Sequence, residues 1–160
     1  MKKILSWEAL KIEVVRRRRE GEKIAFTNGC FDILHVGHVR YLREARKRGD
    51  LLILALNSDV SVRAIKGEKR PLLPEEERAE VVASLDAVDY VTLFNETTPL
   101  RLIEYLRPDV LVKGGDWKKE AVVGGEAVRS WGGEVVLVPV VEGASTTNII
   151  ERVLSAYGQP

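Results

Sequence analysis

Short apolar runs alternate with helical patterns along most of the chain. Runs rich in Val, Ile and Leu predict strands over residues 23–27, 51–56, 89–93, 109–112 and 134–138. Apolar residues at helical spacing predict helices over 6–19, 37–48, 75–85, 98–106, 119–130 and 146–156. Strands that alternate with helices form βαβ units, so we expect an α/β fold. The predicted architecture is Rossmann-like: a doubly wound, parallel five-stranded sheet with helices on both faces.

Composition narrows the class of protein. The 160 residues fit one domain, so we expect residues 1–160 to form a single domain with residues 1–20 as an N-terminal helix extension. A net charge of +1 and the absence of a long apolar run indicate neither a nucleic-acid partner nor a membrane partner. The N-terminus becomes charged too early for a signal peptide, and the lone Cys30 excludes an internal disulfide. We therefore expect a cytoplasmic protein.

A basic run, Arg16 to Arg19, ends the first predicted helix. A phosphate-binding or nucleic-acid-binding patch is one interpretation. We favour the other, a solvated helix end, because cations at a helix C-terminus oppose the helix dipole favourably.

Both histidines of the chain follow the first predicted strand, in the segment Thr27-Asn28-Gly29-Cys30-Phe31-Asp32-Ile33-Leu34-His35-Val36-Gly37-His38. The segment lacks the glycine patterns of dinucleotide-binding and P-loop sites. Gly29 allows close backbone approach, and amides in the turn can face anionic oxygens. The start of the next helix, near Gly37, favours an anion as well. This segment therefore predicts a phosphate site of another kind.

The two histidines lie three residues apart. If residues 35–38 form the first turn of a helix, His35 and His38 project from one side and can donate hydrogen bonds to one phosphate. Two histidines with no third ligand make a poor zinc site, so we predict no protein-held metal. The alternative is a pair of histidines that only satisfy backbone groups at the helix start.

Three further segments carry candidate phosphate ligands. Ser145, Thr146 and Thr147 begin the last predicted helix, where hydroxyls and free amides bind anions or simply cap the helix. Lys66 and Arg70 lie in a predicted loop after the second strand, which can close over a triphosphate or remain solvated. Polar residues that follow the second and fourth strands face the ligand edge of such a sheet: Asn57, Lys113, Gly115 and Asp116.

The segment His35-Val36-Gly37-His38, together with Ser145-Thr146-Thr147, resembles the nucleotidyltransferase superfamily, the cytidylyltransferase-like enzymes with a His-x-Gly-His motif. The resemblance implies transfer of a nucleotidyl group from a nucleoside triphosphate to a phosphate-bearing acceptor, with release of pyrophosphate. It implies that His35 and His38 stabilise the transferred phosphate and that Lys66 contacts the leaving pyrophosphate. The nucleotide-binding residues that it implies are Thr27, Asn28, Gly29, Cys30, Phe31, Gly37, Asn57, Lys113, Gly115, Asp116, Ser145, Thr146 and Thr147.

Within this superfamily, the chain most resembles the D-glycero-β-D-manno-heptose 1-phosphate adenylyltransferases, in their stand-alone form. The resemblance spans the motifs above and Leu85-Asp86-Ala87-Val88-Asp89. It implies ATP and a sugar 1-phosphate as substrates, with ADP-heptose for lipopolysaccharide as the product. It also implies Mg²⁺ bound mainly through ATP phosphates. Asp32 and Arg70 are the expected acceptor-binding residues. The Val- and Leu-rich surfaces can support a homodimer, and the oligomeric state stays open.

Two other functions stay open at this point. A cytidylyltransferase acting on glycerol phosphate or another alcohol phosphate keeps the chemistry and changes both substrates. The absence of an arginine before Ser145 argues mildly against it. A non-catalytic nucleotide-binding module is the alternative of another class, and it does not require paired histidines.

Overall fold

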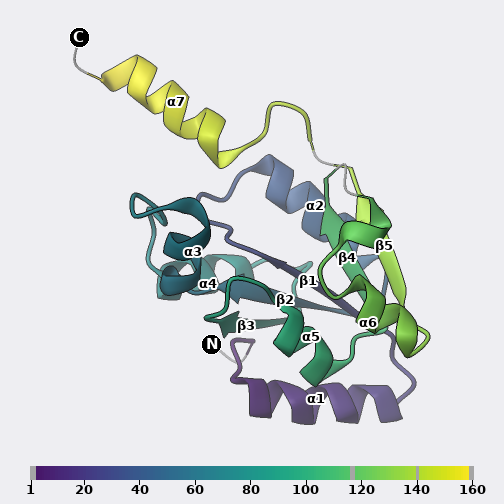
Figure 1. Cartoon of the computed structure of the whole chain (residues 1–160). Helices are drawn as coiled ribbons and strands as arrows, with labels where there is room; N and C mark the ends of the chain where they lie inside the picture. The colour runs from purple at the N-terminus through teal and green to yellow at the C-terminus, as the bar shows by residue number, and fades with distance from the viewer. Residues whose placement is uncertain (1–2, 116–117, 140, 159–160) are drawn as a thin grey trace.

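The protein is built on a five-stranded parallel sheet, described here from a computed structural model that covers residues 3–115, 118–139 and 141–158. The strand order is β3-β2-β1-β4-β5 (Figure 1). The strands are β1 (Ile24–Gly29), β2 (Leu51–Asn57), β3 (Tyr90–Phe94), β4 (Val110–Gly114) and β5 (Glu134–Val138). Every residue of β2 is buried, as expected for a strand with both faces covered. The predicted Rossmann-like sheet is confirmed.

Helices connect the strands at close to the predicted positions. They are α1 (Trp7–Arg19), α2 (Val36–Arg46), α3 (Asp59–Lys66), α4 (Glu75–Ala83), α5 (Leu100–Leu106), η1 (Lys119–Ala121), α6 (Gly125–Ser130) and α7 (Thr146–Tyr157). The predicted helix over 119–130 is two pieces, because Gly124 adopts a left-handed φ of 83° between them. Helix α3 was not predicted, and Lys66 ends this helix instead of lying in a loop. Its start is fixed by Ser58, whose hydroxyl accepts from the Ser61 amide.

The core consists of two apolar layers, one on each face of the sheet. Helices α1, α5 and α6 pack on one face, where Leu10, Val14 and Ile103 are at most 1% exposed. Helices α2 and α4 cover the other face through residues such as Leu42 and Val82. The N-terminal segment is part of this body, because Ile4 pairs with Val91 of β3. No helix in the described ranges is long and apolar enough to cross a membrane.

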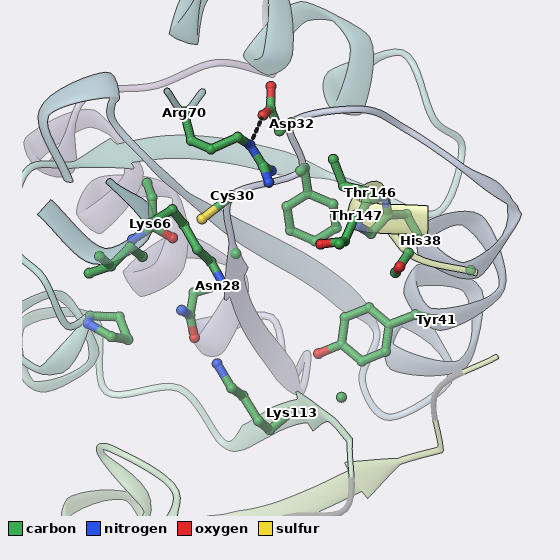
Figure 2. Close-up of a pocket in the computed structure, with 18 of the residues that line it drawn as sticks. Asn28, Cys30, Asp32, His38, Tyr41, Lys66, Arg70, Lys113, Thr146 and Thr147 are labelled. Atoms are coloured by element: carbon green, nitrogen blue, oxygen red, sulfur yellow. Dashed lines mark hydrogen bonds and ion pairs between the residues drawn. The ribbon is translucent and has the colours of Figure 1, made fainter. Parts of the chain in front are cut away.

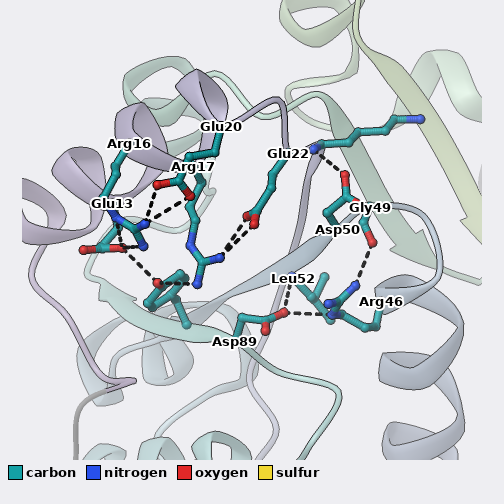
Figure 3. Close-up of polar contacts among 12 residues, drawn as sticks. Glu13, Arg16, Arg17, Glu20, Glu22, Arg46, Gly49, Asp50, Leu52 and Asp89 are labelled. Carbon is teal, nitrogen blue, oxygen red and sulfur yellow. Dashed lines mark hydrogen bonds and ion pairs between the residues drawn. The ribbon is translucent and has the colours of Figure 1, made fainter.

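The basic run at the end of α1 is paired with carboxylates (Figure 3). Arg16 contacts Glu13 and Glu20, both at 2.8 Å. Arg17 contacts Glu22 at 2.9 Å. These ion pairs favour the interpretation of the run as a solvated helix end.

The order of the strands indicates where a ligand can bind, at the end of β1. Strand β1 has β2 on one side and β4 on the other, so the connections leave in opposite directions at this point. Such a switch point opens a crevice beyond the carboxyl ends of the strands. The turn after β1, with both histidines, lies at this edge. Helix α7 extends away from the sheet and has no buried residue (Figure 1).

Candidate functional site

The two histidines are stacked at the start of α2. His35 is the N-cap residue of this helix, and His38 lies in its first turn. Their ring centroids are 3.8 Å apart with 24° between the ring planes. The Nδ1 atom of each ring is buried without a hydrogen-bond partner in the described structure. The predicted placement on one side of the helix is therefore confirmed.

Burial disfavours the protonated form of both imidazoles. Burial lowers the pKa of His35, and burial together with the nearby His35 lowers the pKa of His38 to about 4. Buried polar atoms without partners are rare in folded proteins and need an explanation. An anion that binds beside the rings would favour protonation of the imidazoles.

Tight packing of the β1 turn holds His38 in place. Phe31 is buried, and its ring centroid is 4.9 Å from that of His38. A Cβ at Gly29 would lie 2.7 Å from the Phe31 ring, so the ring fits only over a glycine. Phe31 itself has a left-handed φ of 45°, a strained conformation that is more frequent at functional sites. Gly29 thus serves the packing of Phe31 in addition to the predicted close backbone approach.

A second close approach brings the segment before α7 to the histidines. A Cβ at Gly37 would lie 2.9 Å from the His35 ring and 3.0 Å from the Cβ of Ala144. Ser145 caps α7 as predicted, since its hydroxyl accepts from the Asn148 amide. Figure 2 shows Thr146 and Thr147 beside His38. Residues more than a hundred positions apart in the sequence therefore form one wall.

These groups line one pocket of about 550 Å³ at the carboxyl edge of the sheet (Figure 2). Most of the residues predicted from the sequence line it: Asn28, Gly29, Cys30, Phe31, Asp32, His35, Gly37, His38, Asn57, Lys66, Arg70, Lys113, Ser145, Thr146 and Thr147. The volume falls within the range of small-molecule sites. The arrangement is that of a ligand pocket with polar groups from all parts of the fold.

The pocket carries an excess of positive charge. Lys66, Arg70 and Lys113 line it, against one lining carboxylate in the described residues, Asp32. Lys66 and Lys113 point toward Asn28 from different sides (Figure 2). Burial, with a contribution from the nearby Lys66 charge, lowers the pKa of Lys113. Burial of the Cys30 thiol raises its pKa, so Cys30 acts as a neutral wall residue. This charge balance suits a polyphosphate ligand.

The Asp32 carboxylate is occupied by the segment that follows α3. It accepts from Arg70 Nε at 2.6 Å and from the backbone amides of Leu72 and Leu73. Burial raises its pKa, but the hydrogen bonds from Leu73, Leu72 and Arg70 outweigh burial and leave the pKa lowered. Asp32 thus anchors the loop that carries Arg70.

A buried arginine ties this region together. Arg78 of α4 is 1% exposed. It donates to three backbone carbonyls and to one carboxylate: those of Leu73, Cys30 and Asn57, and that of Asp59. Arg78 therefore connects the ends of β1 and β2 with α3 and the Arg70 loop.

Two residues predicted for nucleotide binding do not line the described pocket, and a third is not described by the structure. Thr27 is buried behind the pocket, where its hydroxyl shares a 2.6 Å hydrogen bond with Tyr41. Gly115 is absent from the described pocket lining, and its amide donates to Val138. Asp116 lies outside the described residues.

The sequence analysis missed other lining residues. Tyr41 lies one helical turn after His38, which is a spacing that indicates the same helix face. Thr97 and Thr98 lie in the loop after β3, three and four residues past its end, so the rule for strand ends could have found them. Val122 and Val123 carried no signal, because they lie between two short helical pieces.

Comparison with known proteins agrees with this geometry. Residues 26–152 match the family model described as Cytidylyltransferase-like. The chain belongs to the cytidylyltransferase-like family. Membership confirms the resemblance to the nucleotidyltransferase superfamily that the histidine motif indicated.

Some members of this family are much more similar to the chain than a family match requires. It is 57% identical over 157 residues to the bifunctional protein HldE of Geobacter sulfurreducens and 58% identical to that of Geobacter metallireducens. Each match covers 98% of this chain but 32% of the relative, so the chain spans about a third of these proteins. The crystal structure of the lipopolysaccharide core biosynthesis protein from Thermoplasma volcanium GSS1 has a TM-score of 0.62 and 27% identity, over 76% of this chain and 98% of that one.

Proposed function

We propose that this chain is an adenylyltransferase that transfers AMP from ATP to D-glycero-D-manno-heptose 1-phosphate. The products are ADP-heptose and pyrophosphate. One observation supports this reaction class: His35, His38 and the start of α7 line the same pocket as Lys66 and Lys113. The acceptor is supported by the sequence resemblance and by the similarity to HldE and to a lipopolysaccharide core biosynthesis protein.

In the proposed reaction, an oxygen of the acceptor phosphate attacks the α-phosphorus of ATP. The bond from this phosphorus to the bridging oxygen breaks, and pyrophosphate leaves with the electron pair. A sugar phosphate is already ionised, so the protein need not supply a general base. Catalysis then consists of positioning and charge stabilisation.

Each group of residues in the pocket would contact a different part of the substrates. His35 and His38 would donate to the α- and β-phosphates, where negative charge develops. The hydroxyls of Thr146 and Thr147 would hold the β- and γ-phosphates at the start of α7. Lys66 would then neutralise charge on the leaving pyrophosphate. Arg70 would face the acceptor, held in place by Asp32.

We propose that Mg²⁺ enters with the ATP phosphates. The described residues contain no group of three His, Cys, Asp or Glu side chains that could hold a metal ion. Phosphate oxygens and water are the usual ligands of Mg²⁺ in such sites, which fits this pocket. When bound, Mg²⁺ supplies charge neutralisation on the phosphates.

The cellular setting is part of the proposal. We propose a cytoplasmic location, which the proposed use of ATP and the single free cysteine support. A homodimer remains a prediction; Val153, Leu154 and Tyr157 of α7 are exposed apolar residues that such an interface could cover.

Pyrophosphate release tests the function. We would measure it with ATP or CTP, each combined with heptose 1-phosphate or glycerol phosphate, and expect ATP with heptose 1-phosphate to give the highest kcat/KM. A preference for CTP with glycerol phosphate would support the cytidylyltransferase alternative. Nucleotide binding without release from any pair would support the non-catalytic module.

Histidine variants test the roles of the two rings in the same assay. His35→Ala and His38→Ala should each lower kcat about 10²–10³-fold, because each removes a preorganised donor to the phosphates. A kcat near that of the unmodified protein in both variants would contradict the proposed role.

A further inference from the structure

The loop after β3 forms a part of the pocket that the proposed phosphate contacts leave unused. Thr97 and Thr98 line the pocket, and both side chains are exposed. Neither hydroxyl forms a hydrogen bond within the described residues. Two free hydroxyls at the wall of a ligand pocket can bind a polar part of a substrate.

A buried relay of hydrogen bonds fixes this loop in place. The Asn57 side-chain amide donates to Ser61 Oγ at 2.9 Å, and Ser61 Oγ donates to the Glu96 carbonyl at 2.6 Å. Asn57 and Ser61 are at most 3% exposed. The Glu96 carboxylate pairs with Arg101 at 2.8 Å. Because the backbone before Thr97 is held from inside, the two hydroxyls are preorganised for a ligand.

The two sides of the pocket differ in chemistry. Beyond β4, the lining consists of Ala121, Val122 and Val123, which suit the flat apolar faces of a base. Beyond β2 and β3, it consists of Thr97 and Thr98 with Pro99, Ile65 and Lys66, and the two threonines suit a ligand that carries hydroxyls. The third region, beside the histidines and the start of α7, is the one proposed above for the triphosphate.

The lysines lie between these regions. Lys66 approaches Asn28 from the β2 side, and Lys113 approaches it from β4 (Figure 2). A phosphate bound by Lys113 near Asn28 would lie beside the turn that binds the reacting α-phosphate, while Lys66 stays available to the leaving pyrophosphate. An acceptor phosphate at this position leaves its sugar directed toward the β3 loop.

We propose that Thr97 and Thr98 form the sugar-recognising edge of an acceptor subsite, in which their hydroxyls bond to the hydroxyl groups of a sugar 1-phosphate whose phosphate is bound by Lys113. This inference rests on the proposed function. Ser61 is a positioning residue for this edge. The Thr97–Thr98 edge favours polyhydroxylated acceptors over short alcohol phosphates, because only the former reach both hydroxyls.

The test is the double variant Thr97→Val with Thr98→Val, which keeps the side-chain shape and removes both hydroxyls. Pyrophosphate release is followed with ATP and heptose 1-phosphate, and the KM of each substrate is measured. We expect the KM for heptose 1-phosphate to rise at least about tenfold, since two hydrogen bonds to the sugar are lost. The KM for ATP should change less than about twofold. The melting temperature of the double variant should equal that of the unmodified protein, because both threonines are exposed.

Two further variants sharpen the result. The matched variant Thr146→Val with Thr147→Val, at the triphosphate end, should show the opposite pattern, a raised KM for ATP and an unchanged KM for heptose 1-phosphate. Ser61→Ala breaks the relay and should raise the KM for heptose 1-phosphate without raising that for ATP. A general loss of structure would instead lower kcat and shift both KM values.

The outcomes separate this inference from the proposed function. An unmodified protein that releases no pyrophosphate with any sugar phosphate overturns both. Normal release, with an unchanged KM for heptose 1-phosphate in the Thr97–Thr98 variant, overturns the acceptor edge alone. A raised KM for ATP in that variant also overturns it, because the β3 loop would then contact the nucleotide.

Discussion

Arg78 offers a sharp test of how the pocket is held together, because its guanidinium is buried and donates four hydrogen bonds. The change Arg78→Met keeps much of the side-chain volume and removes every donor. It leaves the carbonyls of Cys30, Asn57 and Leu73 without this partner, and it leaves the Asp59 carboxylate, 23% exposed, without its 2.6 Å ion pair. Breaking a buried ion pair from one side typically costs about 3–5 kcal/mol. We expect the free energy of unfolding to fall by about that amount.

The assay is thermal unfolding, with urea unfolding as a second measurement. A loss of this size in a domain of 160 residues lowers Tm on the order of 10 °C. Arg78→Lys should lose less, because an ammonium keeps the charge but not the planar set of donors. Arg16→Met is the matched control: Arg16 also pairs with carboxylates, those of Glu13 and Glu20, but it is exposed, and Tm should stay unchanged within error. Equal Tm losses for Arg78→Met and Arg16→Met would refute the assignment of Arg78 as the buried connector.

Three further predictions concern the walls of the pocket. Gly37→Ala should raise the KM for ATP about tenfold or more. The new Cβ would lie 2.9 Å from the His35 ring and 3.0 Å from Ala144, so it must push the histidines away from the segment before α7. An unchanged KM would show that these two parts of the proposed phosphate site need not touch. The pKa of His38 is about 4 in the folded protein and about 6.5 when unfolded, so the unfolded state binds more protons between these values. Stability should therefore be complete above pH 6.5 and decrease as pH falls toward 4, and His38→Asn should flatten this part of a urea-denaturation series across pH. Asp32 has a lowered pKa when folded, so its contribution is present above the unfolded value of about 3.9 and is lost at lower pH. Asp32→Asn should lower Tm at pH 7 and reduce the further loss at acid pH; the same Tm at pH 7 would mean that the loop does not depend on this carboxylate.

Much of the fold was predictable because its signals are local. The apolar runs of all five strands are continuous in the sequence, since a parallel sheet is buried on both faces. The unpredicted α3 is a short helix that depends on Ser58 as its cap and on burial of Val62 against the sheet. Because α3 forms, Lys66 is the last residue of a helix and not part of a loop as predicted, so its backbone is held by the helix.

The candidate site also contains residues that the sequence indicated clearly and residues that it did not. The pair His35 and His38 was recognisable, because three-residue spacing at a helix start places two side chains together by local geometry alone. Thr97 and Thr98 carry no distinctive spacing of their own, and only their place after a strand end indicated them. They join the site only because β3 lies beside β2 in the sheet.

The sequence by itself determined the alternation of strands and helices, the paired histidines and the hydroxyl-rich start of the last helix. Each of these depends on neighbours within a few residues, so the chain encodes it locally. The tertiary structure decided that Arg78 is buried rather than on a helix surface, that Asp32 holds a loop, and that Lys66 and Lys113 point toward the same residue. These properties arise from contacts between segments far apart in the chain, which only the packing of the sheet and its helices brings together.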